Sequence, residues 1–220
     1  MSMGYFVTFE GVEGCGKTTQ IRLLSEFLSN CGMRTVLTRE PGGCPIADKI
    51  RTILLDAGNR ALSPLAELML YAAARAQHVT EVIAPALEAG KIVLCDRFSD
   101  ATVAYQSFGR GIDRAVIDTL NLHACQGVSP DLTVLVDCNP QTGLERARRR
   151  IEATSGPREE RFELEELAFH QRVRAGYRQL AADQPDRFLV IDGSGSIEDI
   201  FVAISSQVLS RIPESPHAVL

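Results

Sequence analysis

The stretch from Gly11 to Thr18 constrains the fold of this chain more than any other part of the sequence. It reads Gly-Val-Glu-Gly-Cys-Gly-Lys-Thr and fits the phosphate-binding pattern G-x-x-x-x-G-K-[ST] at every fixed position. Glycines let the backbone turn tightly and offer N–H groups to phosphate oxygens, the lysine reaches the outer phosphates, and the threonine hydroxyl can bind Mg²⁺. An apolar run precedes the loop and a helical pattern follows it, as the motif requires. We therefore predict a nucleoside triphosphate site here.

Short apolar runs alternate with helical patterns along the chain. This alternation predicts a parallel sheet with helices on both faces, and ligands outside the carboxyl ends of its strands. We expect an α/β fold of the P-loop NTPase type, with three layers and one domain over residues 1–212. A short arginine-rich lid is expected at about 148–162 and a flexible tail at 213–220. The expected strands are 5–9, 34–38, 92–95, 132–137 and 188–192.

The helical patterns have recognisable ends. A long helix is expected from Pro64 towards Gly90, and Pro85 should bend it or start a new helix because proline cannot continue the hydrogen-bond ladder. Asp113 and Asn139 are expected N-caps. The other expected helices are 46–55, one that stops at Gly127, about 164–182, and a last one capped by Ser196 and Asp199.

Composition narrows the class of protein. The chain has 220 residues, 45% of them hydrophobic, and a net charge of −5. A negative net charge argues against a broad nucleic-acid-binding face, which would normally be basic. No apolar run approaches the ~20 residues that span a membrane, and no secretory leader is evident. We expect a cytoplasmic protein that binds neither nucleic acid nor membrane. The six cysteines form no C-x-x-C pair, so neither a zinc site nor a disulfide framework is expected.

Arginine accumulates where the ligand-binding rim is expected. Arg39 and Arg97 each follow a strand. A third source is the stretch around 155–157, with Arg146, Arg148, Arg149, Arg150, Arg158 and Arg161. Because phosphoryl transfer depends on positioning and charge neutralisation, three sources of arginine predict a site that holds more than one phosphorylated ligand.

Ordinary ion pairs are the alternative explanation for these arginines. Arg39 and Arg97 could pair with Glu40 and Asp96 at the surface, although their place at strand ends favours function. Five glutamates interleave with the later cluster, so most of it could be a solvated, salt-bridged helix. We expect only one or two of those arginines to act in the site.

Tyr71 and Arg75 lie four residues apart in the long helical pattern, and His78 continues the same line. This spacing places an aromatic face beside a rigid donor fork, which suits stacking on a base and hydrogen bonding to its carbonyl. Packing at the edge of the core is the commoner use of such a pair. A guanine switch is not expected, because Asp137-Cys138-Asn139-Pro140 stands where a guanine-reading Asn-Lys-x-Asp would be needed.

Motifs in a fixed order along residues 4–210 carry a family resemblance. They are Phe9-Glu10-Gly11-Val12-Glu13-Gly14-Cys15-Gly16-Lys17-Thr18-Thr19, Arg39-Glu40-Pro41-Gly42-Gly43, Tyr71-Ala72-Ala73-Ala74-Arg75, Asp96-Arg97-Phe98, Ala104-Tyr105-Gln106 and Pro130-Asp131-Leu132. Together they resemble the thymidylate kinase family, which transfers the γ-phosphoryl group of ATP to dTMP, giving dTDP and ADP for dTTP supply in DNA synthesis. The resemblance implies Mg²⁺ as cofactor, ATP and dTMP as ligands, and a homodimer.

The resemblance also implies roles for individual residues. Lys17 is catalytic and Thr18 and Asp96 hold Mg²⁺. The ATP site comprises Gly11, Val12, Glu13, Gly14, Cys15, Gly16, Lys17, Thr18 and Thr19. The dTMP site comprises Glu13 near the 3′-hydroxyl, Arg39 and Arg97 on the phosphate, Pro41, Tyr71 stacked on thymine, Arg75 on its exocyclic oxygen, Thr102 and Gln106 beside the ring, and Tyr105 at the 2′ position. The resemblance also implies a catalytic role for Arg97.

The family divides by the source of one further catalytic arginine. One group carries it in the phosphate loop, where this chain has Gly14, and the other supplies it from the lid. This chain is similar to the lid group, typical of bacteria. Arg161, in Glu160-Arg161-Phe162-Glu163, is the best match and Arg158 the second. Phe98 stands where the family usually has tyrosine.

Two other functions remain open at this stage. A deoxynucleoside kinase would act on a neutral 5′-hydroxyl and need a general base, for which Glu40 is the only well-placed candidate. A regulator that binds ATP without transferring phosphate is the non-enzymatic alternative, and the intact Lys17, Asp96 and Arg97 argue against it.

Overall fold

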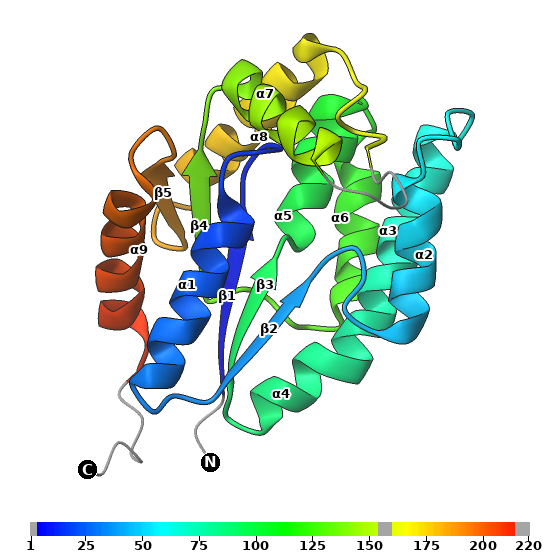
Figure 1. Cartoon of the computed structure of the whole chain (residues 1–220). Helices are drawn as coiled ribbons and strands as arrows, with labels where there is room; N and C mark the ends of the chain where they lie inside the picture. The colour runs from blue at the N-terminus through cyan, green and yellow to red at the C-terminus, as the bar shows by residue number, and fades with distance from the viewer. Residues whose placement is uncertain (1–3, 154–159, 214–220) are drawn as a thin grey trace.

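Five strands form one parallel sheet in the computed structural model, which describes residues 4–153 and 160–213 (Figure 1). The order across the sheet is β2-β3-β1-β4-β5, so the strand that leads into the phosphate loop lies at its centre. All four pairings are parallel. The predicted fold class and all five predicted strands are confirmed. The strands are β1 Tyr5–Glu10, β2 Thr35–Arg39, β3 Ile92–Asp96, β4 Leu132–Asp137 and β5 Phe188–Asp192.

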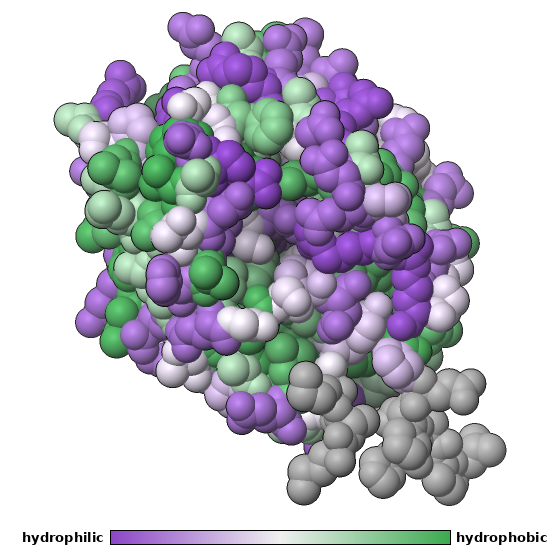
Figure 2. All heavy atoms as spheres, turned by 180° about the vertical axis from the view of Figure 1, so that it is seen from behind, coloured by the Kyte–Doolittle hydropathy of each residue, from purple (hydrophilic) through white to green (hydrophobic). Residues whose placement is uncertain are grey.

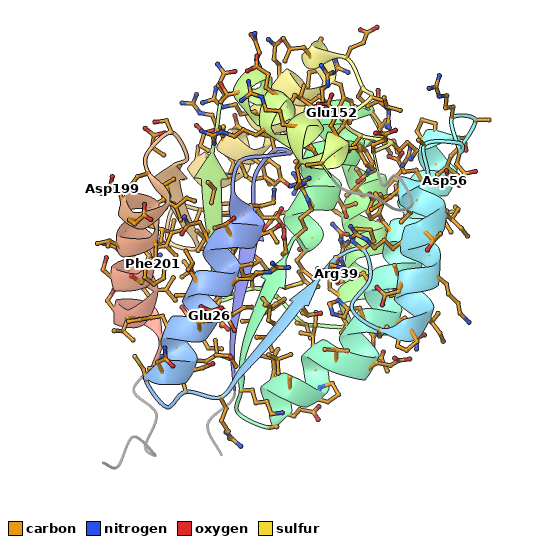
Figure 3. All side chains as sticks on the ribbon, viewed as in Figure 1. Glu26, Arg39, Asp56, Glu152, Asp199 and Phe201 are labelled. Carbon is orange, nitrogen blue, oxygen red and sulfur yellow. The ribbon has the colours of Figure 1, made fainter. Side chains whose placement is uncertain are left out.

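Helices cover both faces of the sheet and complete three layers. α1 (Lys17–Asn30) and α9 (Ile197–Arg211) pack together on one face, where Phe27 meets Phe201 with ring centroids 5.9 Å apart (Figures 1 and 3). α4 (Ala84–Glu88) and α8 (Leu167–Asp183) pack against the other side. The remaining helical segments are α2 Pro45–Leu55, α3 Pro64–His78, η1 Val79–Ile83, α5 Ser99–Thr102, η2 Val103–Gly109, α6 Arg114–Cys125 and α7 Pro140–Glu152.

The long predicted helix is interrupted before its proline. α3 ends at His78, and the π-helical turn η1 leads into α4, whose second residue is Pro85. Proline has no N–H to donate to the preceding turn, and π-helical turns are a known cause of helix kinks. A second π-helical segment, η2, carries two of the predicted site residues, Tyr105 and Gln106.

Strand register brings the predicted site together. Asp96 at the end of β3 pairs with Phe9 on one side and with Arg39 on the other. The residues that follow these strands therefore meet at one edge of the sheet, and α7 lies across that edge at the top of Figure 1. β1 begins and α9 ends at the opposite edge. In the ranges described, no helix has the length and apolar character that a membrane span requires.

Two glycines let α7 approach the phosphate loop. A Cβ added at Gly14 would lie 2.0 Å from the carbonyl oxygen of Gly143, and one added at Gly143 would lie 2.2 Å from that of Glu13. Gly14 also has φ of +65°, which strains any other residue. The backbone of α7 therefore occupies the space that a side chain at position 14 would need, which explains physically why the loop carries no arginine there.

Candidate active site

A cavity of about 960 Å³ opens at the carboxyl edge of the sheet. The phosphate loop forms one side, and residues of α3, α5 and η2 form the other. Gly11 and Val12 are not among the lining residues, and their carbonyl groups instead hold Lys17. Sixteen of the predicted site residues line the cavity: Glu13, Gly14, Cys15, Gly16, Lys17, Thr18, Thr19, Arg39, Pro41, Tyr71, Arg75, Asp96, Arg97, Thr102, Tyr105 and Gln106.

The phosphate loop is shaped before any ligand arrives. Gly11, Gly14 and Gly16 have φ of 140°, 65° and 99°, values that glycine adopts most easily. The ammonium of Lys17 donates to the carbonyl oxygens of Gly11 at 2.9 Å and Val12 at 3.0 Å. α1 starts directly after the loop, so its positive dipole end faces the cavity. The loop therefore combines the ammonium of Lys17 with backbone N–H groups shaped by glycines, which suits the binding of a triphosphate.

Thr18 and Asp96, the two predicted metal ligands, lie side by side at the cavity. The hydroxyl of Thr18 donates to Oδ2 of Asp96 at 2.8 Å, and both residues line the cavity. Hydroxyl and carboxylate oxygens suit Mg²⁺, which takes one or two protein oxygens together with phosphates and water. No cluster of three or more His, Cys, Asp or Glu residues suited to a metal ion is found in residues 4–153 and 160–213. The pair fits a metal that arrives with its nucleotide.

Glu13 is the most densely bonded carboxylate of the site. It accepts hydrogen bonds from Arg97 at 3.2 Å, from His170 at 3.1 Å and from the hydroxyl of Tyr105. Burial alone would raise the pKa of Glu13. The hydrogen bond from His170 and the positive charges of Arg97, His170 and Lys17 lower this pKa to about 2. Glu13 is therefore a carboxylate at any physiological pH.

Arg97 holds a strained backbone conformation at the end of β3. Its φ of +73° is rare for a residue with a side chain, and its N–H donates to the carbonyl of Phe9. The guanidinium lies 4.8 Å from the ring centroid of Tyr105 and donates to Tyr177 as well as to Glu13. Strain of this kind is maintained at sites where it places a group for function. Here it turns the guanidinium into the cavity.

The predicted base-binding residues lie together across the cavity from the phosphate loop. Arg75 is only 1% exposed and donates to Glu40, Asn121, the carbonyl of Phe98 and Thr102. These four bonds use four of its five N–H groups. Tyr71 lies 6.5 Å from the ring of Phe162 and lines the cavity beside it. The guanidinium of Arg75 is thus held rigid, and one of its N–H groups has no hydrogen-bond partner among residues 4–153 and 160–213.

Arg39 and Glu40 form other pairs than those considered from the sequence. Arg39 is exposed and lies 3.5 Å from Asp48, at the carboxyl end of β2 (Figure 3). Glu40 is buried, and its two oxygens accept from Arg75 at 2.8 Å and His78 at 3.0 Å. A carboxylate held by two buried donors is poorly suited to take a proton. The general-base role considered for Glu40 is therefore not supported.

The structure describes one of the two lid arginines favoured by the sequence. Arg158 lies outside the described residues. Arg161 is buried, bonds Glu67 at 2.6 Å and the carbonyl of Leu54, and is not among the residues that line the cavity. Arg146 and Arg150 on α7 do line it. They are four residues apart and so share one helix face, a spacing that could have singled them out in the sequence.

His170 and Glu67 are two buried residues that sequence reasoning missed. His170 lies between Glu13 and the carbonyl oxygen of Phe162, at 3.1 and 3.0 Å. The ring of His170 therefore bridges a carboxylate oxygen of the phosphate loop and a backbone carbonyl oxygen. This residue joins the phosphate loop to the lid. Neither residue belongs to a local sequence motif, and the partners of both are distant in sequence. No local pattern could therefore point to them.

Comparisons with known proteins agree with this geometry. The family model "Thymidylate kinase" matches residues 9–204. A thymidylate kinase of Trichlorobacter lovleyi is 69% identical over 94% of this chain and 98% of its own length. One from Pelobacter propionicus is 65% identical over 99% of this chain and 100% of its own length. The crystal structure of thymidylate kinase from Ehrlichia chaffeensis superposes with a TM-score of 0.74 at 35% identity, covering 94% of this chain and 99% of that one.

The low pKa of Glu13 predicts how stability depends on pH. Its pKa is lowered from 4.5 to about 2 in the folded chain, so its contribution is complete above pH 4.5 and is lost as pH falls towards 2. Glu13→Gln should therefore unfold more easily at pH 7. Its deficit in unfolding free energy should narrow by roughly 2 kcal/mol between pH 5 and pH 3.

Urea denaturation at a series of pH values measures this deficit. The same substitution at Glu145, exposed on α7, is the matched control and should leave the free energy of unfolding within about 0.5 kcal/mol of wild type. A deficit for Glu13→Gln that stays constant from pH 5 to pH 3 would contradict the charged state assigned to Glu13.

Proposed function

This chain belongs to the thymidylate kinase family and phosphorylates dTMP to dTDP with ATP, and we propose that the 960 Å³ cavity holds both substrates with their reacting phosphates between Lys17 and Arg97. The observation that carries this proposal is the continuity of the lining. It runs from the phosphate loop, past Asp96 and Arg97, to Tyr71 and the base-binding residues without a break between donor and acceptor ends.

ATP occupies the phosphate-loop side. The backbone N–H groups of residues 11–19 and the ammonium of Lys17 bind its phosphates, and the dipole of α1 adds to the field. Thr18 and Asp96 would hold Mg²⁺, which would supply positive charge to neutralise the transferring phosphoryl group. Lys17 must leave the carbonyl oxygens of Gly11 and Val12 to reach the phosphates.

dTMP occupies the opposite side. Arg39 and Arg97 bind its phosphate, and Glu13 accepts a hydrogen bond from the 3′-hydroxyl. Tyr71 stacks on thymine beside Pro41, and the free N–H of Arg75 donates to the exocyclic oxygen, with Thr102 and Gln106 beside the ring. Tyr105, which donates to Glu13, lies where a 2′-hydroxyl would have to fit.

The acceptor supplies its own nucleophile. A phosphate monoester oxygen is already anionic, so the reaction needs charge neutralisation rather than a general base. This agrees with the surroundings of Glu40, whose two oxygens accept from Arg75 and His78. The cavity is therefore better suited to a nucleoside monophosphate than to a nucleoside.

The sequence favours Arg161 and Arg158 as the lid's catalytic cations. The structure adds Arg146 and Arg150 to the candidates, because both line the cavity from α7. We place Arg150 at the transferring phosphoryl group. Arg161 then fixes the segment that begins at residue 160 against Glu67 and Leu54.

A cytoplasmic homodimer completes the proposal. Apolar side chains remain exposed on adjacent helices, with Leu65 and Met69 on α3 and Val116 and Leu122 on α6. Figure 2 shows apolar residues gathered on parts of the face opposite that of Figure 1. Exposed apolar patches of this kind commonly mark contact surfaces. The dimer would pack through these helices.

A panel of acceptors tests the proposed function. With ATP and Mg²⁺, dTMP should give ADP and dTDP rapidly, and dUMP should react more slowly because it lacks the methyl group. Thymidine should not react, because its 5′-hydroxyl has neither a negative charge nor a base to activate it. Coupled ADP release together with chromatography of the product measures all three. Phosphorylation of thymidine at a rate similar to that of dTMP would refute the proposal.

Alanine substitutions separate the two lid assignments. Arg150→Ala should lower kcat by at least about 100-fold with little change in KM for dTMP, because a cation at the transferring group acts mainly in the transition state. Arg161→Ala should lower kcat by less than about tenfold if it only holds the lid. Arg149, exposed on the same helix and not in the cavity lining, is the control and should tolerate alanine. The opposite ranking of Arg150 and Arg161 would restore Arg161 as the catalytic residue.

A further inference from the structure

A buried carboxylate on α3, Glu67, lies one hydrogen bond behind the base end of the cavity. It is 1% exposed and is not itself a lining residue. Its Oε1 accepts from Nε2 of Gln106 at 2.8 Å and from Nε of Arg110 at 3.3 Å. Its Oε2 accepts from Arg110 at 3.2 Å and from Arg161 at 2.6 Å. All of these partners donate, so every contact uses Glu67 as an acceptor.

This arrangement fixes the side-chain amide of Gln106. A glutamine amide has a donor end and an acceptor end of nearly the same shape, and either can face a neighbour. A carboxylate only accepts, so Gln106 must turn its NH₂ group to Glu67. Its carbonyl oxygen, Oε1, then points away from Glu67.

The freed oxygen faces the cavity. Gln106 is a lining residue, and no hydrogen bond to its Oε1 occurs within the described part of the chain. Buried side-chain atoms without a partner are, over that same part, Oε1 of Gln20 and Nη2 of Arg161. Oε1 of Gln106 is not one of these two atoms. Because it has no hydrogen-bond partner in the described residues either, it cannot be fully enclosed by protein. It is an acceptor held ready at the cavity surface.

The chemistry of pyrimidines gives this acceptor a use. Thymine has a hydrogen on N3, whereas N3 of cytosine is an acceptor and would face Oε1 unpaired. A site built to accept a hydrogen bond discriminates strongly against a ligand that lacks the donor. We propose that Glu67 is a positioning residue that fixes Gln106 so that its carbonyl accepts from N3–H of the base. This inference rests on the proposed placement of thymine beside Arg75 and Gln106.

Glu67→Gln tests the proposal with a change of nearly equal size. A glutamine at position 67 can donate to Oε1 of Gln106 as readily as it accepts from Nε2, so the amide of Gln106 is no longer fixed. The probe is 3-deaza-dTMP, in which a C–H group replaces N3–H and the neighbouring exocyclic oxygen O4 becomes a hydroxyl. Arg75 meets the changed O4 in wild type and variant alike, so the change in preference between the two enzymes reports the contact of Gln106 with N3. Wild type should prefer dTMP over this analogue by at least roughly tenfold in kcat/KM, and Glu67→Gln should reduce that preference by roughly fivefold, chiefly by losing activity on dTMP.

The ratio of the two substrates separates positioning from structural damage. Glu67 also holds Arg161, so its substitution can disturb the lid, but that disturbance lowers both rates equally and leaves the ratio unchanged. Glu165→Gln is the matched control, because Glu165 bonds Arg110 at 2.6 Å without contacting Gln106. Its preference should equal that of wild type. Gln106→Leu, which keeps Glu67, should reduce the preference by at least as much and provides a second test if Glu67→Gln folds poorly.

Each outcome bears on a definite claim. A Glu67→Gln enzyme that keeps the wild-type preference would overturn the positioning role. Wild type that phosphorylates dTMP and 3-deaza-dTMP equally well would overturn the N3 contact while leaving the dTMP kinase activity intact. Absence of dTMP phosphorylation by wild type would instead overturn the proposed function itself. Melting temperatures with and without ATP establish that each variant is folded before its ratio is read.

Discussion

The site depends on one largely buried carboxylate, Glu13, and the hydrogen-bond donors around it. Arg97 comes from the end of β3, Tyr105 from η2 and His170 from α8, and all three donate to this residue of the phosphate loop. Removing either partner of such a buried pair would leave a charge without compensation, which costs several kcal/mol. The phosphate loop is thereby joined to Arg97, the arginine proposed to bind dTMP, and, through His170, to Phe162.

Close backbone packing sets the other constraint on the chemistry. Because Gly14 and Gly143 meet without side chains, α7 lies directly on the phosphate loop. A cation cannot be carried at position 14, and the same contact brings Arg146 and Arg150 of α7 to the cavity. The choice between an arginine in the loop and one in the lid thus has a steric cause in this chain.

Most of the fold could be predicted from sequence, because buried parallel strands and the phosphate loop have strong local patterns. The prediction succeeded even for short strands such as residues 92–95, an unbroken apolar run. Contacts between distant elements could not be predicted in this way. Nothing near Glu67 or His170 in the sequence identifies Gln106 or Glu13 as a partner, and Arg161 and Arg150 differ in orientation rather than in local composition. The burial of Arg75 was likewise hidden, since an i, i+4 pair fits a surface as well as a pocket.

The central claim is that one cavity holds the donor and the acceptor together, with their phosphates between Lys17 and Arg97. Calorimetric titration with a compound that joins adenosine and thymidine through a chain of phosphates tests it most directly. The account predicts one molecule bound per chain, more tightly than ATP or dTMP alone, and competition by each of them separately. Binding of two molecules per chain, or competition by ATP without competition by dTMP, would contradict it.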